Sequence, residues 1–385
     1  MIKRLRVKNF LSLRDFDIGL GQMNVLVGPN MAGKTNLIEC LRFMTQICLK
    51  GLIQTFIDRG GFPEVIWKGS RSEDRISLLL EGEKQTNGDP ARFSYEISIV
   101  GSPSGYFFIE FERLIAAVAE KEIVLVDLKS GQGHVNRADG TRVTDTTGSP
   151  NSSALELKVP GWEGMEFKSY LSAWHFYDLI PQVMKQANAA VLQGFLAETG
   201  ENLSSWLMTL FTKHPESKER IKQVIADALP ELVEFLTPPT QFSTTHLIAR
   251  EKNLKDVVNI WRMAHGELVF LAFLSLIFAP DELGAPLYCV EEPENHLHPR
   301  LLDTLVQVQG QVAKELGPNA AQIIVTTHSP HLVDKVNLED LIVMERRNGE
   351  TTWSRPSSRQ NLRDMLAREQ VGLGELWYSG ALGGL

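Results

Sequence analysis

Residues 28–35 read Gly28-Pro29-Asn30-Met31-Ala32-Gly33-Lys34-Thr35, and this stretch decides the fold class expected for the chain. It matches the pattern G-x-x-x-x-G-K-[ST] of phosphate-binding loops. The run before it, Met23–Val27, is short and apolar, as a buried strand is. The run after it, Asn36–Lys50, has apolar residues at helical spacing and contains neither Pro nor Gly. A strand, the loop and a helix in this order are the context in which the pattern indicates a phosphate site.

The loop residues have separate expected roles in holding a nucleotide. Gly28 and Gly33 allow backbone amides to close around phosphate oxygens, and the next helix points its positive N-terminus at them. Lys34 is predicted to be catalytic, because it is expected to reach the outer phosphates, and the hydroxyl of Thr35 is expected to bind Mg²⁺. We therefore predict ATP and Mg²⁺ as cofactors. The residues predicted to bind the nucleotide are Asn30, Met31, Ala32, Gly33, Lys34, Thr35 and Asn36.

Length and composition favour a cytoplasmic globular protein. A chain of 385 residues is long for one core, so we expect a main domain with an insertion. The hydrophobic content of 43% and the charged content of 22% are typical of globular proteins. Cys40, Cys48 and Cys289 lie in apolar contexts without metal-ligand spacing, which indicates buried, reduced thiols. The longest apolar stretch, Leu268–Pro280, suits a core helix, and we expect neither a signal peptide nor membrane insertion.

The charge of the chain is distributed unevenly. The net charge is -8, so we do not expect the whole molecule to bind nucleic acid non-specifically. Eight basic and three acidic residues nevertheless give the first 50 positions a charge of +5, which leaves -13 for the remainder. Arg4, Arg6 and Lys8 alternate on one face of the first predicted strand. This pattern fits either a solvated strand face or a patch that faces DNA.

Strand-like segments dominate the first part of the chain, and helical periodicity follows. The first 27 residues are predicted to form three short strands. Residues 129–153, rich in Gly, Ser, Thr and Asp, are predicted to form a loop. Further strands are predicted near 76–81, 92–100, 105–112, 122–128, 154–159 and 241–250. Helices are predicted at 167–193, 201–213 and 216–229.

From Glu267 onward, helices and strands alternate. The predicted order is a helix ending at Pro280, a strand at 287–290, a helix at 299–315, a strand at 322–326, a helix at 330–335 and a strand at 340–345. This alternation implies a parallel sheet with helices on its faces. The helical segment therefore interrupts an α/β nucleotide domain. We predict an N-terminal lobe at 1–165, a helical insertion at 166–240 and a C-terminal lobe at 241–385.

Two acids follow the apolar strand 287–290, as the second half of an ATP site requires. Glu291 is predicted to hold Mg²⁺, directly or through a water. Glu292, one position later, is predicted to be the general base that polarises the attacking water. The alternative is that both acids are surface residues at the end of a strand.

Histidines follow both of the last two interior strands. Residues 294–299 read Glu-Asn-His-Leu-His-Pro, an H-x-H pair near two Glu residues, and His328 and His331 form an H-x-x-H pair. These spacings are compatible with zinc or a di-metal centre. Neither pair supplies a closed ligand set. His328 stands where the strand at 322–326 ends, at the edge that faces the nucleotide in open α/β sheets. We therefore predict that His328 is catalytic, through a hydrogen bond to the γ-phosphate or to the attacking water, with a structural histidine as the alternative.

Taken in order, these segments give the sequence a family resemblance. The N-terminal run 1–10, the loop G-P-N-M-A-G-K-T, the segment E-E-P-E-N-H-L-H-P and the run T-T-H-S-P resemble ABC-type ATPases of the RecF, SMC and OLD group. The chain looks most like the stand-alone, ABC-like predicted ATPases of the AAA family in bacteria. Segments 59–69 and 374–384 resemble the corresponding segments of those proteins. The resemblance implies an ABC-type ATPase head with mixed sheets and an inserted helical subdomain.

The resemblance also implies how such a head works. Two heads sandwich two ATP molecules, and each site combines the phosphate loop of one head with a signature segment of the other. The matching segment here is Met263-Ala264-His265-Gly266-Glu267, in which Gly266 is expected to meet the nucleotide. A Ser is usual where this chain has Ala264, and an Asp is more usual than Glu291. The missing hydroxyl puts the hydrolysis rate and the strength of the dimer in question.

Several functions fit these features. The first is an ATP-hydrolysing switch in DNA repair or phage defence, with a separately encoded effector because no nuclease segment is expected in this chain. The second is a nucleotide-gated clamp with little turnover, which Ala264 motivates. A GTPase has only Asp281–Gly284 in its favour and lacks an N-K-x-D motif, and a transporter subunit lacks a membrane segment. Four aromatic residues of the insertion form either the core of its lobe or a surface for a partner or DNA: Trp174, Phe176, Tyr177 and Trp206.

Overall fold

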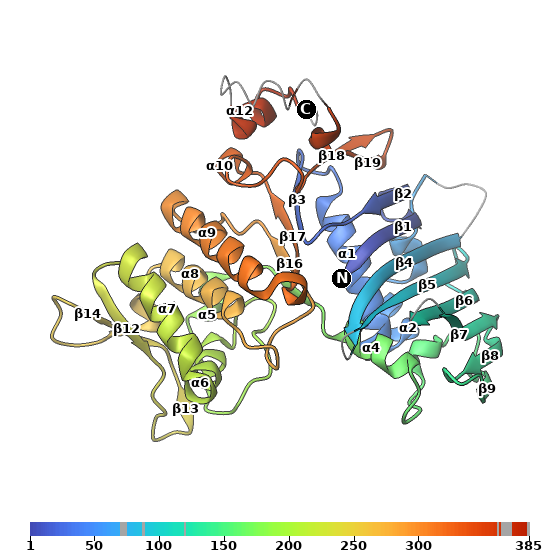
Figure 1. The fold of residues 1–385 in the computed structure, drawn as a ribbon, viewed down its shortest axis with the longest axis horizontal. Helices are drawn as coiled ribbons and strands as arrows, with labels where there is room; N and C mark the ends of the chain where they lie inside the picture. Colours follow the sequence, from blue (N-terminus) through green and yellow to red (C-terminus); the bar gives the residue numbers. More distant parts are fainter. Residues whose placement is uncertain (70–74, 87–88, 119–120, 360–361, 363–371, 383–385) are drawn as a thin grey trace.

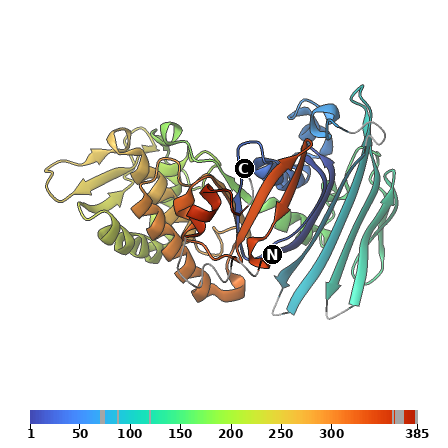
Figure 2. The same ribbon diagram turned by 90° about the horizontal axis from the view of Figure 1, so that it is seen from above.

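The computed structural model describes residues 1–69, 75–86, 89–118, 121–359, 362 and 372–382. The last residues of the segment 374–384 therefore lie outside the described part. The described chain forms a large antiparallel sheet, a central parallel sheet and a lobe of helices and short strands, shown in Figures 1 and 2.

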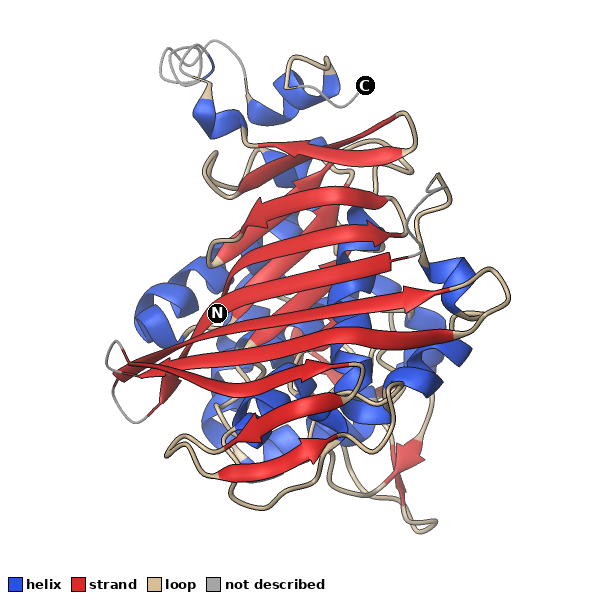
Figure 3. Cartoon of the chain, turned by 90° about the vertical axis from the view of Figure 1, so that its right-hand side faces the viewer, coloured by secondary structure: helices blue, strands red, loops and turns tan. Residues whose placement is uncertain are grey.

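The antiparallel sheet has eight strands in the order β2-β1-β4-β5-β6-β7-β8-β9 (Figure 3). Along β1, apolar side chains such as Leu5 and Val7 point inward, while Arg4 and Arg6 point outward, as the period of two requires. The strands are β1 (Ile2–Phe10), β2 (Leu13–Gly19), β4 (Arg75–Thr86), β5 (Asp89–Gly101), β6 (Phe107–Val118), β7 (Lys121–Lys129), β8 (Gln132–Asn136) and β9 (Arg142–Thr146).

The central sheet has six strands in the order β10-β16-β17-β3-β18-β19, of which the first five are parallel. The carboxyl ends of parallel strands meet at one edge, where open sheets bind ligands. The strands are β3 (Met23–Val27), β10 (His175–Tyr177), β16 (Leu287–Glu291), β17 (Gln322–Thr327), β18 (Leu341–Arg347) and β19 (Glu350–Ser354).

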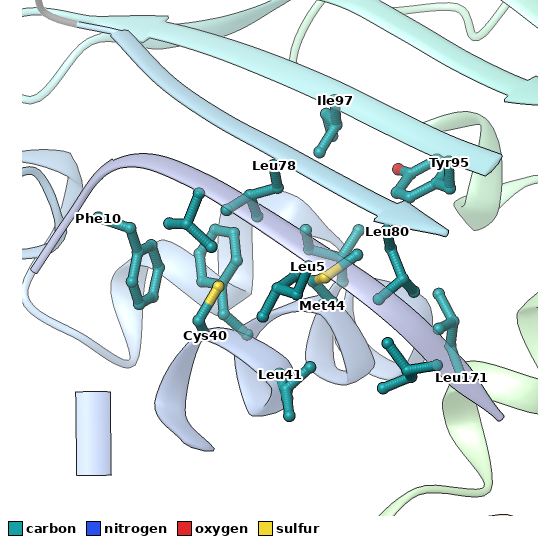
Figure 4. Close-up of a cluster of buried hydrophobic side chains, with 14 of the residues drawn as sticks. Leu5, Phe10, Cys40, Leu41, Met44, Leu78, Leu80, Tyr95, Ile97 and Leu171 are labelled. Atoms are coloured by element: carbon teal, nitrogen blue, oxygen red, sulfur yellow. The ribbon is translucent and has the colours of Figure 1, made fainter. Parts of the chain in front are cut away.

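Helix α1 (Lys34–Lys50) is packed between the two sheets and is buried over most of its length. One core cluster joins α1 to residues of both sheets, including Leu26 and Ile324 of the central sheet. Full burial of a large apolar side chain contributes about 1.5–3 kcal/mol, so this cluster fixes the helix that begins at the phosphate loop. Figure 4 labels ten members of this cluster: Leu5, Phe10, Cys40, Leu41, Met44, Leu78, Leu80, Tyr95, Ile97 and Leu171.

The other face of the central sheet carries helices and the smaller strands. A second core cluster joins α8 (His265–Ile277) and α9 (Pro299–Leu316) to side chains of β16 and β17. The remaining helices are α2 (Leu52–Ile57), α3 (Phe62–Val65), α4 (Gly164–Ser172), α5 (Pro181–Met184), α6 (Leu203–Lys213), α7 (Pro215–Ala228), α8 (His265–Ile277), α9 (Pro299–Leu316), α10 (Pro330–Val333) and α12 (Leu373–Tyr378). The remaining strands are β11 (Asn188–Ala189), β12 (Leu232–Leu236), β13 (Thr244–Thr245), β14 (Ile248–Glu251) and β15 (Val258–Asn259).

The helix predicted at 167–193 is wrong beyond Ser172, where α4 ends. Residues 175–177 instead form β10, which pairs in parallel with β16 and becomes an edge strand of the central sheet. Aromatic residues favour strands, and Pro181 begins a separate short helix. This segment therefore belongs to the sheet that builds the site, although the surrounding sequence is helical.

Two further predictions between 129 and 159 are wrong. The predicted loop contains the strands β8 and β9, which extend the large sheet. The Gly-rich turns beside these two short strands led to the prediction of a loop. The strand predicted at 154–159 begins as a 3-10 helix, Ala154–Glu156. Ser153 caps this turn: its hydroxyl accepts from the Leu155 amide at 3.0 Å, and the Glu156 carboxylate accepts from the Ser153 amide at 2.8 Å.

The predicted helices of the second half and the predicted buried thiols are confirmed. The helices near 201–213, 216–229 and 299–315 correspond to α6, α7 and α9. The three cysteines are free and buried, and burial raises the pKa of each thiol. No helix in the described residues is long and apolar enough to cross a membrane. The four aromatic residues of the insertion are all at least nine-tenths buried, which favours the core interpretation: Trp174, Phe176, Tyr177 and Trp206.

Candidate nucleotide site

The phosphate loop lies between β3 and α1, as the sequence predicts. Gly33 has a left-handed backbone (φ 100°) that favours glycine, and a Cβ there would lie 2.0 Å from Thr351 Oγ1. A Cβ on Gly28 would lie 2.2 Å from the Met344 carbonyl oxygen. The loop therefore tolerates only glycine at both positions, because β18 and β19 pack directly against it.

Two residues that the sequence did not predict, Ser12 and Thr351, support the phosphate loop from below through hydrogen bonds. Thr351 Oγ1 donates to the Ala32 carbonyl at 3.0 Å and lies 2.6 Å from Ser12 Oγ. Asn36 Nδ2 donates to the same Ser12 hydroxyl at 2.6 Å. The Asn36 side chain thus supports the loop in this structure, while Asn30 and Met31 are exposed. No sequence motif identifies Ser12 or Thr351, since they come from opposite ends of the chain.

Lys34 is buried at the start of α1. Its Nζ donates to the carbonyls of Gly28 at 2.9 Å and Pro29 at 3.2 Å, and lies 2.9 Å from His328 Nε2. Burial lowers the pKa of Lys34 to about 8, although Glu292 partly opposes this shift. The lysine is therefore held across the loop, next to the predicted histidine.

Glu292 and His328 meet at the carboxyl edge of the central sheet. His328 Nε2 lies 3.5 Å from Glu292 Oε1, and Asn295 Nδ2 donates to Glu292 Oε2 at 3.0 Å. Burial and the Lys34 charge lower the pKa of His328, so the neutral imidazole is favoured. The structure thus brings together three residues that the sequence predicted to be catalytic.

Glu291 and Glu292 face different partners although they are consecutive. Glu292 has a left-handed backbone (φ 43°), unusual for a non-glycine residue, and its amide donates to the Thr326 carbonyl at 3.0 Å. Glu291 lies next to the Thr35 side chain, and Arg42 Nη2 lies 3.6 Å from Glu291 Oε1. Burial raises the pKa of Glu291, and the Thr35 and Arg42 contacts oppose that shift. The two predicted metal ligands, Thr35 and Glu291, are therefore adjacent.

Glu294 was not predicted as a site residue, yet its carboxylate organises the end of β17. Glu294 Oε1 accepts from Thr327 Oγ1 at 2.6 Å, from the His328 amide at 2.8 Å and from the Ser329 amide at 3.2 Å. These bonds fix the turn that carries His328. The sequence feature that could have indicated this role is that Glu294 is the third acidic residue within four positions of the strand 287–290.

Gly266 lies on a different helix from the one that follows the phosphate loop. It lies in the first turn of α8, which packs in the second core cluster, whereas α1 packs in the first. A Cβ on Gly266 would lie 2.8 Å from the His296 carbonyl oxygen, so the signature-like segment meets the segment after Glu292. The Glu267 carboxylate accepts from the Ala264 amide at 2.9 Å, which stabilises the start of the helix.

The histidine pairs are engaged in other contacts. His331 Nε2 lies 2.8 Å from Asp303 Oδ1, and His298 Nδ1 accepts from the Arg300 amide at 3.2 Å. Among the described residues, no group of three or more His, Cys, Asp and Glu side chains is arranged to hold a metal ion. The zinc alternative therefore has no support from this part of the chain.

Arg4 and Arg6 of β1 pair with acids of neighbouring strands. Arg4 forms ion pairs with Asp17 at 2.6 Å and Glu81 at 3.5 Å, and Arg6 lies 3.9 Å from Asp17. The outer face of the large sheet is thus a mixture of both charges. This arrangement favours the solvated strand face over a patch that faces DNA.

Comparison with known proteins gives the chain a family. The family model described as AAA domain, putative AbiEii toxin, Type IV TA system matches residues 23–334. An OLD nuclease from Thermus scotoductus is 51% identical over 375 residues. That match covers 90% of this chain and 62% of the relative, so the chain spans less than two thirds of the length of that relative.

Solved structures with the same fold include SMC heads. The SMC head bound to the C-winged helix domain of ScpA has a TM-score of 0.56 and 16% identity, over 92% of this chain and 97% of that chain. An SMC head with an extended coiled coil, bound to the C-terminal domain of ScpA derived from Pyrococcus furiosus, has a TM-score of 0.52 and 13% identity, over 95% and 99% of the two chains. The predicted fold class is confirmed: the fold is that of an ABC-type P-loop head. The sequence is similar to that of an OLD nuclease, and the fold is similar to that of SMC heads. The chain belongs to the family described as AAA domain, putative AbiEii toxin, Type IV TA system.

Proposed function

We propose that the protein binds and hydrolyses ATP, with Glu292 as general base. The observation that supports this most strongly is the contact of Lys34 with His328, and of His328 with Glu292, beside the loop amides. A general base must lie within reach of the proton that it removes, at the edge where the phosphates lie. Glu292 lies at that edge, within 3.5 Å of His328, which supports its assignment as the base.

The proposed roles follow from the contacts. The loop amides and Lys34 hold the phosphates, and Glu292 takes a proton from the water that attacks the γ-phosphorus, releasing ADP and phosphate. Neutral His328 orients that water or a γ-phosphate oxygen through a hydrogen bond. The Thr35 hydroxyl and the Glu291 carboxylate are oxygen ligands of the type that Mg²⁺ prefers, and they are already adjacent. When bound there, Mg²⁺ would neutralise charge on the phosphate oxygens.

We propose that two copies form the complete site. Gly266 begins α8, whose apolar side chains pack in the second core cluster, whereas Ala32 of the phosphate loop packs in the first. In the proposed dimer, the signature-like segment of one head would reach the nucleotide of the other. The amides at the start of α8 would then approach the γ-phosphate. Ala264 cannot supply a hydroxyl contact, which favours a second candidate function, a nucleotide-gated clamp with little turnover.

The relatives support a role in DNA transactions, such as repair or phage defence. The chain matches 62% of an OLD nuclease, so we do not extend nuclease activity to it. We propose instead that the ATPase acts as a switch in the cytoplasm and that a separate effector or partner protein carries out any step on DNA. DNA as a second partner is also part of this proposal, at a surface other than the outer face of β1, where Arg4 and Arg6 pair with acids.

Steady-state ATP turnover by the purified chain, with and without duplex DNA, tests the proposal. A DNA-coupled ATPase should release phosphate faster when DNA is present, because DNA would stabilise the closed head dimer. Light scattering on the same samples should show dimers only with ATP. Binding of ATP without phosphate release under either condition would instead support the clamp.

The pH dependence of ATP binding gives an independent prediction. Burial lowers the pKa of Lys34 to about 8, so the free protein loses this positive charge as the pH rises through that value. ATP should bind the protonated form, so its apparent Kd should be constant below about pH 7 and rise about tenfold per pH unit above about pH 8. Fluorescence titration with a labelled ATP analogue measures this profile. A constant Kd up to about pH 10 would contradict the role given to Lys34.

A further inference from the structure

Arg42 joins the proposed metal ligand to the segment that follows β10. It lies on α1, two turns after the phosphate loop, and only 16% of its side chain is exposed. Its Nη2 donates to Glu198 Oε1 at 2.6 Å and lies 3.6 Å from Glu291 Oε1. Its Nη1 donates to Glu39 Oε2 at 2.9 Å, and the guanidinium stacks over the Phe176 ring at 5.1 Å. One nitrogen is thus shared between two carboxylates from different parts of the chain.

The segment that carries Glu198 begins beside Glu291. Tyr177, the last residue of β10, pairs in register with Val290 of β16. Asp178 therefore follows at the same sheet edge as Glu291, and its charge contributes to the raised pKa of Glu291. The chain leaves the central sheet at this point and enters residues 178–201.

Residues 178–201 fold back on themselves, so that Glu198 returns to the sheet edge. The Asp178 amide donates to the Glu198 carbonyl at 3.1 Å, and the Ile180 amide donates to the Thr199 carbonyl at 3.1 Å. Both ends of this segment are therefore tied together next to Glu291. The Arg42 guanidinium makes an ionic contact between α1 and Glu198, at the end of this segment.

The shared contact can be redistributed. Arg42 Nε is buried without a hydrogen-bond partner among the described residues. Hydrogen bonds therefore do not fix all the nitrogens of the guanidinium in one position. A cation on Glu291 would neutralise that carboxylate and repel Arg42. The Nη2 group would then be left with Glu198, its nearer partner. Binding at the metal site would strengthen the contact that holds the 178–201 segment.

We propose that Arg42 is a positioning residue that couples the metal-binding carboxylate of Glu291 to the 178–201 segment through Glu198. This inference rests on the proposed function, since it assumes that Mg²⁺ binds Glu291 together with the nucleotide. Its consequence is that the inserted lobe, which continues into α6, responds to occupation of the ATP site.

Hydrogen exchange measured by mass spectrometry tests this coupling in the full chain. Backbone amides of 178–201 should exchange at least about threefold more slowly with a non-hydrolysable ATP analogue and Mg²⁺ than with the same analogue and EDTA. Glu198→Gln should remove this difference, because the amide carries no charge to hold Arg42. Glu198 is 49% exposed, so the variant should fold. Glu201→Gln is the matched control, because Glu201 lies in the same segment and bonds to Thr199.

The outcomes separate this inference from the proposed function. Mg²⁺-dependent protection in the wild type and in Glu201→Gln, but not in Glu198→Gln, would support it. Equal protection in Glu198→Gln, or protection of residues 28–36 without any change in 178–201, would overturn the coupling while nucleotide binding stands. If neither region changes, the nucleotide does not bind as proposed, and the coupling fails with the proposed function.

Discussion

Glu292→Gln should lower the rate of ATP turnover by about 10²- to 10⁴-fold, the usual contribution of a general base. Glutamine has nearly the same shape and can keep the contact with Asn295, but it cannot take a proton from water. ATP binding should survive, because the phosphate contacts come from Lys34 and the loop amides. The variant should therefore accumulate as an ATP-bound dimer, detectable by light scattering beside a phosphate-release assay.

A matched surface substitution provides the control for this result. Glu315 lies on α9 and forms an exposed ion pair with Arg220, so Glu315→Gln should leave turnover within about twofold of the wild type. Undiminished phosphate release by Glu292→Gln would remove Glu292 as the base. A loss of ATP binding together with turnover would indicate that Glu292 holds the loop rather than the water.

The parts of the site that could be predicted from the sequence are those in which the functional residues directly follow a recognisable strand. The phosphate loop stands between a strand and a helix, and Glu291 and Glu292 directly follow an apolar run. His328 follows the same rule at the end of β17. In each case the strand is local, and parallel strands bring their carboxyl ends to one edge.

The parts that could not be predicted depend on neighbours distant in sequence. His175–Tyr177 became a strand because β16 lies beside it, and no local pattern indicates that pairing. Arg42 looks like an ordinary helix surface residue until Glu198 and Glu291 are brought to it from two other segments. Glu294 acts on the turn after β17, so its role depends on the order of strands in the central sheet. Such contacts follow from the topology, which one sequence does not specify.

Lys34→Ala should weaken ATP binding by at least about a hundredfold, equivalent to about 3 kcal/mol for the loss of a buried charged partner. The substitution removes the charge that faces the outer phosphates and the donor that joins the Gly28 and Pro29 carbonyls to His328. Turnover should fall below detection, since the substrate is neither held nor neutralised. Equilibrium binding of a fluorescent ATP analogue measures the first effect, and phosphate release measures the second.

The stability of this variant distinguishes a lost ligand contact from a lost fold. Burial lowers the pKa of Lys34, so its charged form carries a desolvation cost in the free protein. Removing the ammonium relieves that cost while three hydrogen bonds are lost, so the thermal midpoint without nucleotide should change little. Lys50→Ala, at the exposed end of the same helix, removes an ion pair with Asp58 and should bind ATP normally. If Lys34→Ala unfolded the protein, or if both variants bound ATP equally well, Lys34 would be a structural residue, and the phosphate site would rest on the loop amides alone.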